Sequence, residues 1–149
     1  MATTRIFEQK IKSYIKKVQL DTDAALQGVV RELLTIYKRR SPIDTSAYRA
    51  NWKVSIKIPD KRYNLKDRVD APLGSIPTQS ELASQEPEIQ KIRWGDRVFV
   101  TNSVPYAKYL EGYGGNPPRS SFAPSGIWRP GYAELLQKLP EVLQRYIKR

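Results

Sequence analysis

The sequence predicts an α+β fold in which a long N-terminal helix packs on a small, mostly antiparallel β-sheet, with a long loop or arm and a C-terminal helix completing the chain. Two observations predict this class. Apolar residues recur every three or four positions near both ends of the chain, as in amphipathic helices, and alternate with polar residues in the middle, as in strands. With 149 residues, the chain 1–149 has the usual length of a single domain.

The N-terminal part is expected to be helical. Residues 1–20 form an N-terminal helical segment in which lysines separate the apolar residues from Phe7 onward. Those lysines either lie on a solvated face or bind an anionic partner. Asp21 can cap a second helix, which carries a wide apolar face and ends before Pro42. Because the apolar phase nearly carries across this junction, one continuous helix over residues 4–40 is the alternative.

A strand and a long irregular segment are expected next. Apolar side chains alternate with Lys or Ser over residues 52–58, which predicts a strand with one buried and one basic face, ended by Pro59. Residues 60–77 are polar and contain two prolines and a glycine, so they predict an extended loop or arm. Long excursions of this kind in small domains are often functional.

Short elements are expected after the arm. Thr78 and Glu81 match a capping box, in which each side chain bonds to the other residue's backbone amide, and this predicts a short helix over residues 78–86 before Pro87. Residues 89–100 predict either two strands about a turn or one strand and its approach.

The C-terminal part is expected to contain two helices separated by irregular chain. A short helix begins at Pro105 and ends before Gly112. Residues 112–131 are rich in Gly and Pro and predict irregular structure. A C-terminal helix over residues 130–149 shows a further amphipathic face, and Pro140 is expected to kink it.

The composition excludes several classes of chemistry. The chain has no Cys and no His, so disulfides, Cys-based metal sites and a Ser-His-Asp triad are absent. It contains neither the phosphate-binding GxxxxGK[ST] run nor the dinucleotide-binding GxGxxG run. We therefore expect a protein that is not an enzyme and holds no cofactor. A metal-dependent nuclease built on Asp and Glu is an alternative, although no carboxylate cluster with a lysine at suitable spacing supports it.

The charge distribution points to an acidic partner. The net charge is +11, with +6 in residues 1–60, −1 in residues 61–90 and +6 in residues 91–149. Such an excess suits either nucleic acid or an acidic protein surface. The N-terminus has no apolar signal segment, and no apolar run is long enough to span a membrane, so we expect a soluble protein.

Three segments hold unusual residues in close spacing: residues 41–52 with Asp44, Thr45, Tyr48, Arg49 and Trp52; residues 100–112 with Asn102, Pro105, Tyr106, Ala107 and Glu111; and residues 121–127 with Pro124 and Gly126. Their order and spacing resemble the head-tail joining or tail-completion (neck) proteins of long-tailed bacteriophages, the group that includes minor tail protein Z of lambda-like phages. That family typically shows Pro-Val-Asp-Thr-Gly after its long helix, Asn-Xaa-Xaa-Pro-Tyr-Ala-Xaa-Xaa-Leu-Glu after a strand and Ala-Pro-Xaa-Gly before its last helix. Ser46 departs from it, because the family usually has Gly there.

This resemblance implies a structural virion protein, assembled in the host cytoplasm and located in the tail or neck. It implies a homo-oligomeric ring, usually of six subunits, that joins the neck connector or adaptor protein to the tail tube while phage DNA passes through its lumen. A tail-completion and a tail-terminator role remain equally open. The alternative is a nucleic-acid-binding protein without sequence preference, supported by the positive charge and by aromatic residues interleaved with basic ones, as in residues 91–94.

Several residues of the three segments are expected to shape local structure or contacts. Asp44 and Thr45 suit the turn between helix and strand. Tyr48 and Arg49 form either an anchor pair at a subunit interface or the edge of the core with a surface ion pair. Glu111 stands in the last turn of a short helix, where the dipole disfavours a carboxylate, so we expect an Arg or Lys partner from its own chain or a neighbour.

The remaining candidates are a loop and a set of cations. Asn102, Pro105 and Tyr106 are expected to shape a loop and to pack an aromatic ring on the sheet. The arm carries four cations that contact either DNA in a ring lumen, through phosphates, or an adjacent ring: Lys61, Arg62, Lys66 and Arg68.

Overall fold

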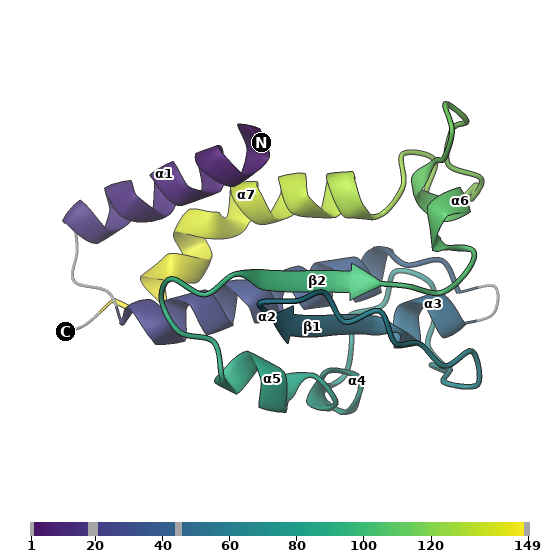
Figure 1. Cartoon of the computed structure of the whole chain (residues 1–149), viewed down its shortest axis with the longest axis horizontal. Helices are drawn as coiled ribbons and strands as arrows, with labels where there is room; N and C mark the ends of the chain where they lie inside the picture. The colour runs from purple at the N-terminus through teal and green to yellow at the C-terminus, as the bar shows by residue number, and fades with distance from the viewer. Residues whose placement is uncertain (1, 18–20, 44–45, 148–149) are drawn as a thin grey trace.

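The computed structural model describes residues 2–17, 21–43 and 46–147. Figure 1 shows the order of its elements: α1 (Ala2–Lys17), α2 (Thr22–Arg40), α3 (Ala47–Ala50), β1 (Trp52–Ile56), α4 (Gln79–Ala83), α5 (Glu86–Gln90), β2 (Val98–Asn102), α6 (Ala107–Glu111) and α7 (Trp128–Gln144). The two strands form an antiparallel sheet, so the predicted α+β class is confirmed.

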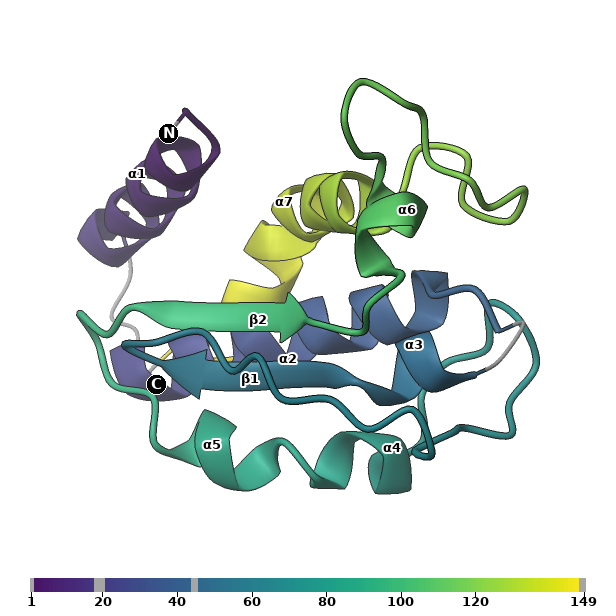
Figure 2. The same ribbon diagram turned by 45° about the vertical axis from the view of Figure 1, so that its right-hand side comes forward.

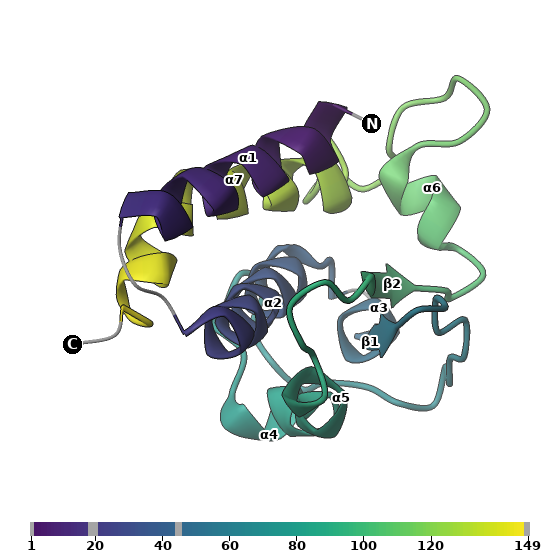
Figure 3. The same cartoon turned by 60° about the vertical axis from the view of Figure 1, so that its left-hand side comes forward.

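Helix α2 is the central element. It packs against α7 on one side and against β1 and α5 on the other, an arrangement that Figure 3 shows end-on. The side chain of Asp21 caps it by accepting a hydrogen bond from the amide of Ala24 at 3.2 Å, and the helix ends at Arg40, before Pro42. The N-terminal region therefore contains two separate helices, and their junction, residues 18–20, lies outside the described residues.

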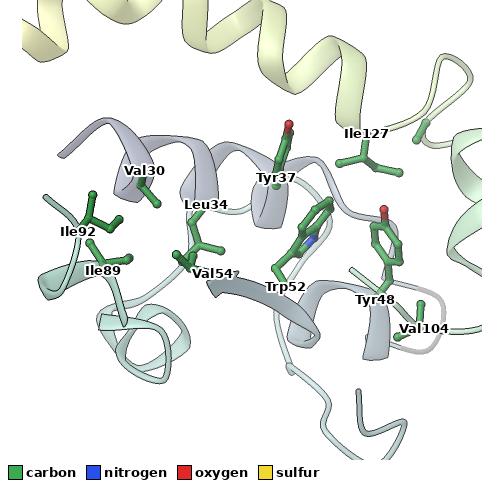
Figure 4. Close-up of a cluster of buried hydrophobic side chains, with 11 residues drawn as sticks. Val30, Leu34, Tyr37, Tyr48, Trp52, Val54, Ile89, Ile92, Val104 and Ile127 are labelled. Carbon is green, nitrogen blue, oxygen red and sulfur yellow. The ribbon is translucent and has the colours of Figure 1, made fainter. Parts of the chain in front are cut away.

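The core consists of two apolar clusters that share α2. One cluster joins α2 to the sheet and α5, and Figure 4 shows its residues: Val30, Leu34, Tyr37, Tyr48, Trp52, Val54, Ile89, Ile92, Val104, Ala123 and Ile127. The other joins α2 to α7 and α1: Ile11, Ala25, Val29, Ile36, Leu135, Leu139, Val142 and Leu143. The partly buried Leu26 and Leu33 pack against both clusters. Each fully buried leucine, such as Leu34 or Leu135, contributes about 1.5–3 kcal/mol.

The sheet is short, and its faces differ as predicted. Trp52 pairs with Asn102, and Val54 pairs with Val100. Trp52 and Val54 are buried against α2, whereas Lys53 and Ser55 lie on the opposite face. The strand ends at Ile56, two residues earlier than predicted, because Lys57 has φ +73° and turns the chain.

The expected arm is a long segment without helix or strand between β1 and α4. Its first part lies on the sheet face opposite α2, where the Thr101 hydroxyl donates to the Asp60 carbonyl at 2.7 Å. Further along, Asn64 and Asn51 exchange two hydrogen bonds of 2.8 and 3.0 Å. Figure 2 shows this part of the arm running along β1.

The segment after the arm differs from the prediction. Thr78 does cap a helix, but α4 ends at Ala83, and a second short helix, α5, follows it. Pro87 lies in the first turn of α5, where its missing amide hydrogen is not needed. Of the two alternatives for residues 89–100, the single strand is correct, since Ile89 belongs to α5 and only β2 is a strand.

The two C-terminal helices begin and end at other residues than predicted. Helix α6 begins at Ala107 rather than at Pro105, because Pro105 lies in the turn closed by the hydrogen bond from the Ala107 amide to the Val104 carbonyl. Helix α7 begins at Trp128 and ends at Gln144, with Pro140 inside it, and Figure 1 shows it bending in its C-terminal half. Within the described ranges, no helix combines the length and apolarity needed to cross a membrane.

Replacing Ser46 by Gly should stabilise the protein. Ser46 has φ +59°, a left-handed conformation that costs a residue with a Cβ roughly 1–2 kcal/mol. Two effects reduce this gain. The Ser46 hydroxyl donates to the Ile43 carbonyl at 3.3 Å, and a glycine makes the unfolded chain more flexible. The net gain in unfolding free energy should therefore be about 0.5 kcal/mol. Chemical denaturation would measure it. Ser46→Ala, which keeps the strain and loses the hydroxyl, should be less stable than the natural protein, and a Gly variant no more stable than the Ala variant would contradict this account.

Candidate functional site

The three sequence segments meet at the carboxylate of Glu111. The Tyr48 hydroxyl, from the first segment, donates to Glu111 Oε1 at 2.8 Å. The amides of Ile127 and Trp128 donate to both carboxylate oxygens at 3.0–3.2 Å. The expected Arg or Lys partner is not found within the described chain, and such a partner from a neighbouring subunit stays a prediction. Glu111 instead binds the N-terminus of α7, where a negative charge is favoured.

Gly126 makes this approach possible. Its φ is +81°, and a Cβ on it would lie 2.7 Å from Glu111 Oε2 and 3.4 Å from Glu111 Cα. The Gly126 amide closes a turn by donating to the Ala123 carbonyl at 3.0 Å, with Pro124 at the second position, where proline is favoured. The Ala-Pro-Xaa-Gly run thus places the start of α7 against α6.

Tyr48 connects this contact to the core. Its ring packs edge-on against Trp52, with centroids 5.4 Å apart, and Trp52 stacks on Tyr37 at 4.5 Å. The Trp52 indole donates to the Ser41 hydroxyl at 2.8 Å. Burial, and then the neighbouring Glu111 carboxylate, raise the pKa of Tyr48 well above its usual range, so the phenol is a hydrogen-bond donor at all ordinary pH values.

The second segment is tied to the first by Asn102. Its side-chain amide donates to the Tyr48 carbonyl at 2.6 Å, which fixes the end of β2 against α3. As expected, Tyr106 packs an aromatic ring on the core, with its centroid 6.5 Å from that of Tyr48, and Ala107 packs beside it. Pro105 is exposed in the turn before α6.

Arg49 is buried within its own chain. It is fully buried and binds the Glu81 carboxylate through two nitrogens at 3.0–3.2 Å, so its ion pair is not on the surface, and the guanidinium is not exposed to a neighbour. It also donates to the Ser75 hydroxyl at 3.1 Å, which holds the end of the arm. Glu81 is used here, so the capping box of α4 is only half formed. Beside it, the Lys38 ammonium, also buried, donates to the Arg49 carbonyl at 3.1 Å.

The four arm cations are exposed, and of these only Lys61 lines a groove together with Glu111. Arg62 is paired with Asp60 at 2.8 Å, and this hydrogen-bonded pair lowers the pKa of Asp60 to about 2. The other three, Lys61, Lys66 and Arg68, form no ion pair in the described part of the chain. Asp44 and Thr45 lie outside the described residues.

A groove of about 330 Å³ lies beside the Glu111 contact. It runs along β2, between the arm at Pro59 and Lys61 on one side and α6 with Trp128 on the other. Sequence reasoning missed Lys108 and Trp128 in this groove, and Lys38 and Glu81 in the buried cluster, because each is placed by contacts distant in sequence. No three carboxylates come close enough to hold a metal ion in the ranges the structure describes.

Removing the Glu111 carboxylate should destabilise the fold. Glu111→Ala leaves the Tyr48 hydroxyl and two amides at the start of α7 without their acceptor, which should cost about 3 kcal/mol of unfolding free energy. Urea denaturation would measure it, and Glu141→Ala, an exposed glutamate on α7, is the control and should cost under about 0.5 kcal/mol. A loss as small for Glu111 as for Glu141 would contradict the role of this carboxylate.

Stability should rise with pH above about 8. Burial lowers the pKa of Lys38 to about 8, although Glu81 opposes this effect. Between that value and the usual pKa near 10.5, the unfolded chain binds more protons than the folded one, so stability should increase by up to about 1.4 kcal/mol per pH unit. Denaturation at pH 7.5, 8.5 and 9.5 would measure the rise. Lys38→Met should flatten it and Lys53→Met should not; the same rise in both variants would show that another group is responsible.

No protein-family model matches the chain, and no curated protein or solved structure shows significant similarity to it.

Proposed function

We propose that this protein is a non-enzymatic virion component of a long-tailed bacteriophage. In this proposal it forms a homo-oligomeric ring of six subunits that completes the tail end or neck and joins the head connector to the tail tube around the DNA. The observation that carries the proposal is the meeting of Tyr48, Glu111 and Gly126, one from each of the three family-like segments.

This observation bears on function because the segments are distant in sequence. Tyr48 and Glu111 are separated by 63 positions, yet the two side chains share a hydrogen bond. Gly126 is the residue that a close approach of the Glu111 carboxylate requires. A chance likeness in three separate runs would not select residues that depend on one another physically. Their interdependence supports treating the three runs as one structural signature, which raises the weight of the resemblance.

The surface of the subunit supports assembly. Several large apolar side chains are strongly exposed, in the arm and in the Gly- and Pro-rich segment: Ile58 (74%), Ile76 (76%), Tyr113 (57%), Phe122 (57%) and Trp128 (52%). Where such groups combine into one contiguous patch, they form the kind of surface that contacts other proteins. The unpaired arm cations Lys61, Lys66 and Arg68 supply phosphate contacts for DNA in a lumen, which need no base recognition.

Light scattering and negative-stain microscopy test this proposal. The protein is studied alone, and then mixed with tail tubes or DNA-filled heads of its phage, at 50 mM and 500 mM salt. We expect rings, in solution or on the particles, that persist at high salt because apolar contacts are not screened. A protein that ignores both particles, and instead binds free DNA with an affinity that collapses at high salt, would overturn the proposal.

A nucleic-acid-binding protein is the second candidate, and one observation favours it. Lys108 lies 5.1 and 4.7 Å from the ring centroids of Tyr109 and Tyr113, and Arg119 lies over Tyr109 at 4.6 Å. Exposed aromatic rings between cations are typical of surfaces on which bases stack. Adding Mg²⁺ or Mn²⁺ to the DNA-binding assay and following cleavage tests the nuclease alternative in the same experiment.

A further inference from the structure

Strand β2 has an open edge. Val54 pairs with Val100, and its amide donates to the Gln85 side chain at 2.8 Å, on the side of β1 away from β2. Val54 and Val100 are therefore paired without hydrogen bonds to each other. In an antiparallel ladder, both residues of a pair of this type point their backbone groups away from the partner strand. The amides and carbonyls of Val98, Val100 and Asn102 therefore point away from β1, and no hydrogen bond to them from another described residue is found.

The groove lies at the C-terminal part of this edge, beside Val100 and Asn102, and is basic. Lys61 stands on one wall and Lys108 on the other, and both are exposed. Among the described residues that line the groove, Glu111 is the only carboxylate, and it is already occupied by the Tyr48 hydroxyl and two amides. An extended chain that carries carboxylates would therefore find backbone partners and opposite charge in the same place.

The arm contains a segment of that kind at residues 67–71, Asp-Arg-Val-Asp-Ala. It includes no turn or bend, and exposed Arg68 and Asp70 alternate with half-buried Val69 and Ala71, as in a strand. The Asp67 amide closes the preceding turn by donating to the Asn64 carbonyl at 3.0 Å. Within the described chain, no hydrogen bond involves the backbone of residues 68–71, and no ion pair involves Asp67 or Asp70. The segment is five residues long, the same length as β2.

We propose that residues 67–71 of one copy add as a strand to the open edge of β2 in the next copy, with Asp67 and Asp70 facing Lys61 and Lys108. This inference rests on the proposed ring. A ring of more than two subunits needs two different surfaces on each subunit, and this contact supplies them. The end of the arm is held near α4 by Arg49, beyond β1, whereas the groove is on the β2 side, so each copy can give its arm to one neighbour and receive that of another.

A charge exchange tests the contact. The arm variant carries Asp67→Lys and Asp70→Lys, and the groove variant carries Lys61→Glu and Lys108→Glu. Each variant places like charges on both sides of the proposed contact, so each should reduce assembly at least tenfold. Assembly is measured at 50 mM salt, for the protein alone and on tail tubes. Mixed in equal amounts, the two variants should restore assembly, because alternating subunits again pair opposite charges at every contact. The controls are Glu88→Lys, in α5, and Lys91→Glu, at the end of that helix. Each reverses an exposed charge away from the contact, and both should assemble normally.

The outcomes separate this contact from the ring itself. Rings of the natural protein with restored assembly in the mixture support the strand addition. Rings that form equally well with both variants overturn it and leave the ring intact. If only the groove variant loses assembly and mixing does not restore it, the groove does not bind a second copy of this chain. DNA or an acidic segment of another protein would then be its occupant. A natural protein that assembles neither alone nor on tails overturns both the ring and the contact.

Discussion

The carboxylate of Glu111 is the contact on which the arrangement of the C-terminal half depends. Without it, the first amides of α7 would lack an acceptor, since no side chain of α7 itself caps the helix. The same carboxylate holds the Tyr48 hydroxyl, so the start of α7 and α3 are fixed to one point. Helix α7 then lies along α2 and closes the second apolar cluster, which also includes Ile11 of α1. Because Tyr48 belongs to the first apolar cluster and α7 contributes to the second, the hydrogen bonds to this one carboxylate connect the two clusters.

Polar contacts of this kind compensate for the small sheet. Two strands alone are marginally stable in water, and here side chains rather than further strands support the outer edge of β1 and the end of β2. Gln85 covers an amide on the outer edge of β1, and Asn102 ties the end of β2 to the Tyr48 carbonyl. Arg49, with Glu81, connects α3 to α4 and the arm. The outer edge of β2 is the part of the sheet that receives no such support from the described chain.

Elements fixed by local sequence could be predicted, and those fixed by distant contacts could not. Helix α2 was predictable because Asp21 and Pro42 mark its ends and its apolar face is wide. The positive φ of Ser46 was not predicted, although the bacteriophage proteins that the three segments resemble usually have Gly at the matching position, and Gly adopts this conformation without strain. Helix α5 was missed because a proline such as Pro87 is equally compatible with the end of one helix and with the first turn of the next. The partners of Glu111 and Arg49 come from residues 16 to 63 positions away, and no local pattern identifies them.

The proposed strand addition also changes what the arm cations can do. The arm carries cations at Lys61, Lys66 and Arg68 that have no ion pair in the described chain, and all three are candidates for contact with DNA. Lys61, however, forms a wall of the groove beside β2, where a neighbour's carboxylate would hold it. In that arrangement Lys66, just before the donated segment, and Arg68, within it, remain for phosphate, and both would lie at the junction between two subunits. DNA contact and ring closure would then be coupled, because Lys66 and Arg68 would be placed beside a neighbouring subunit only when the arm binds that neighbour.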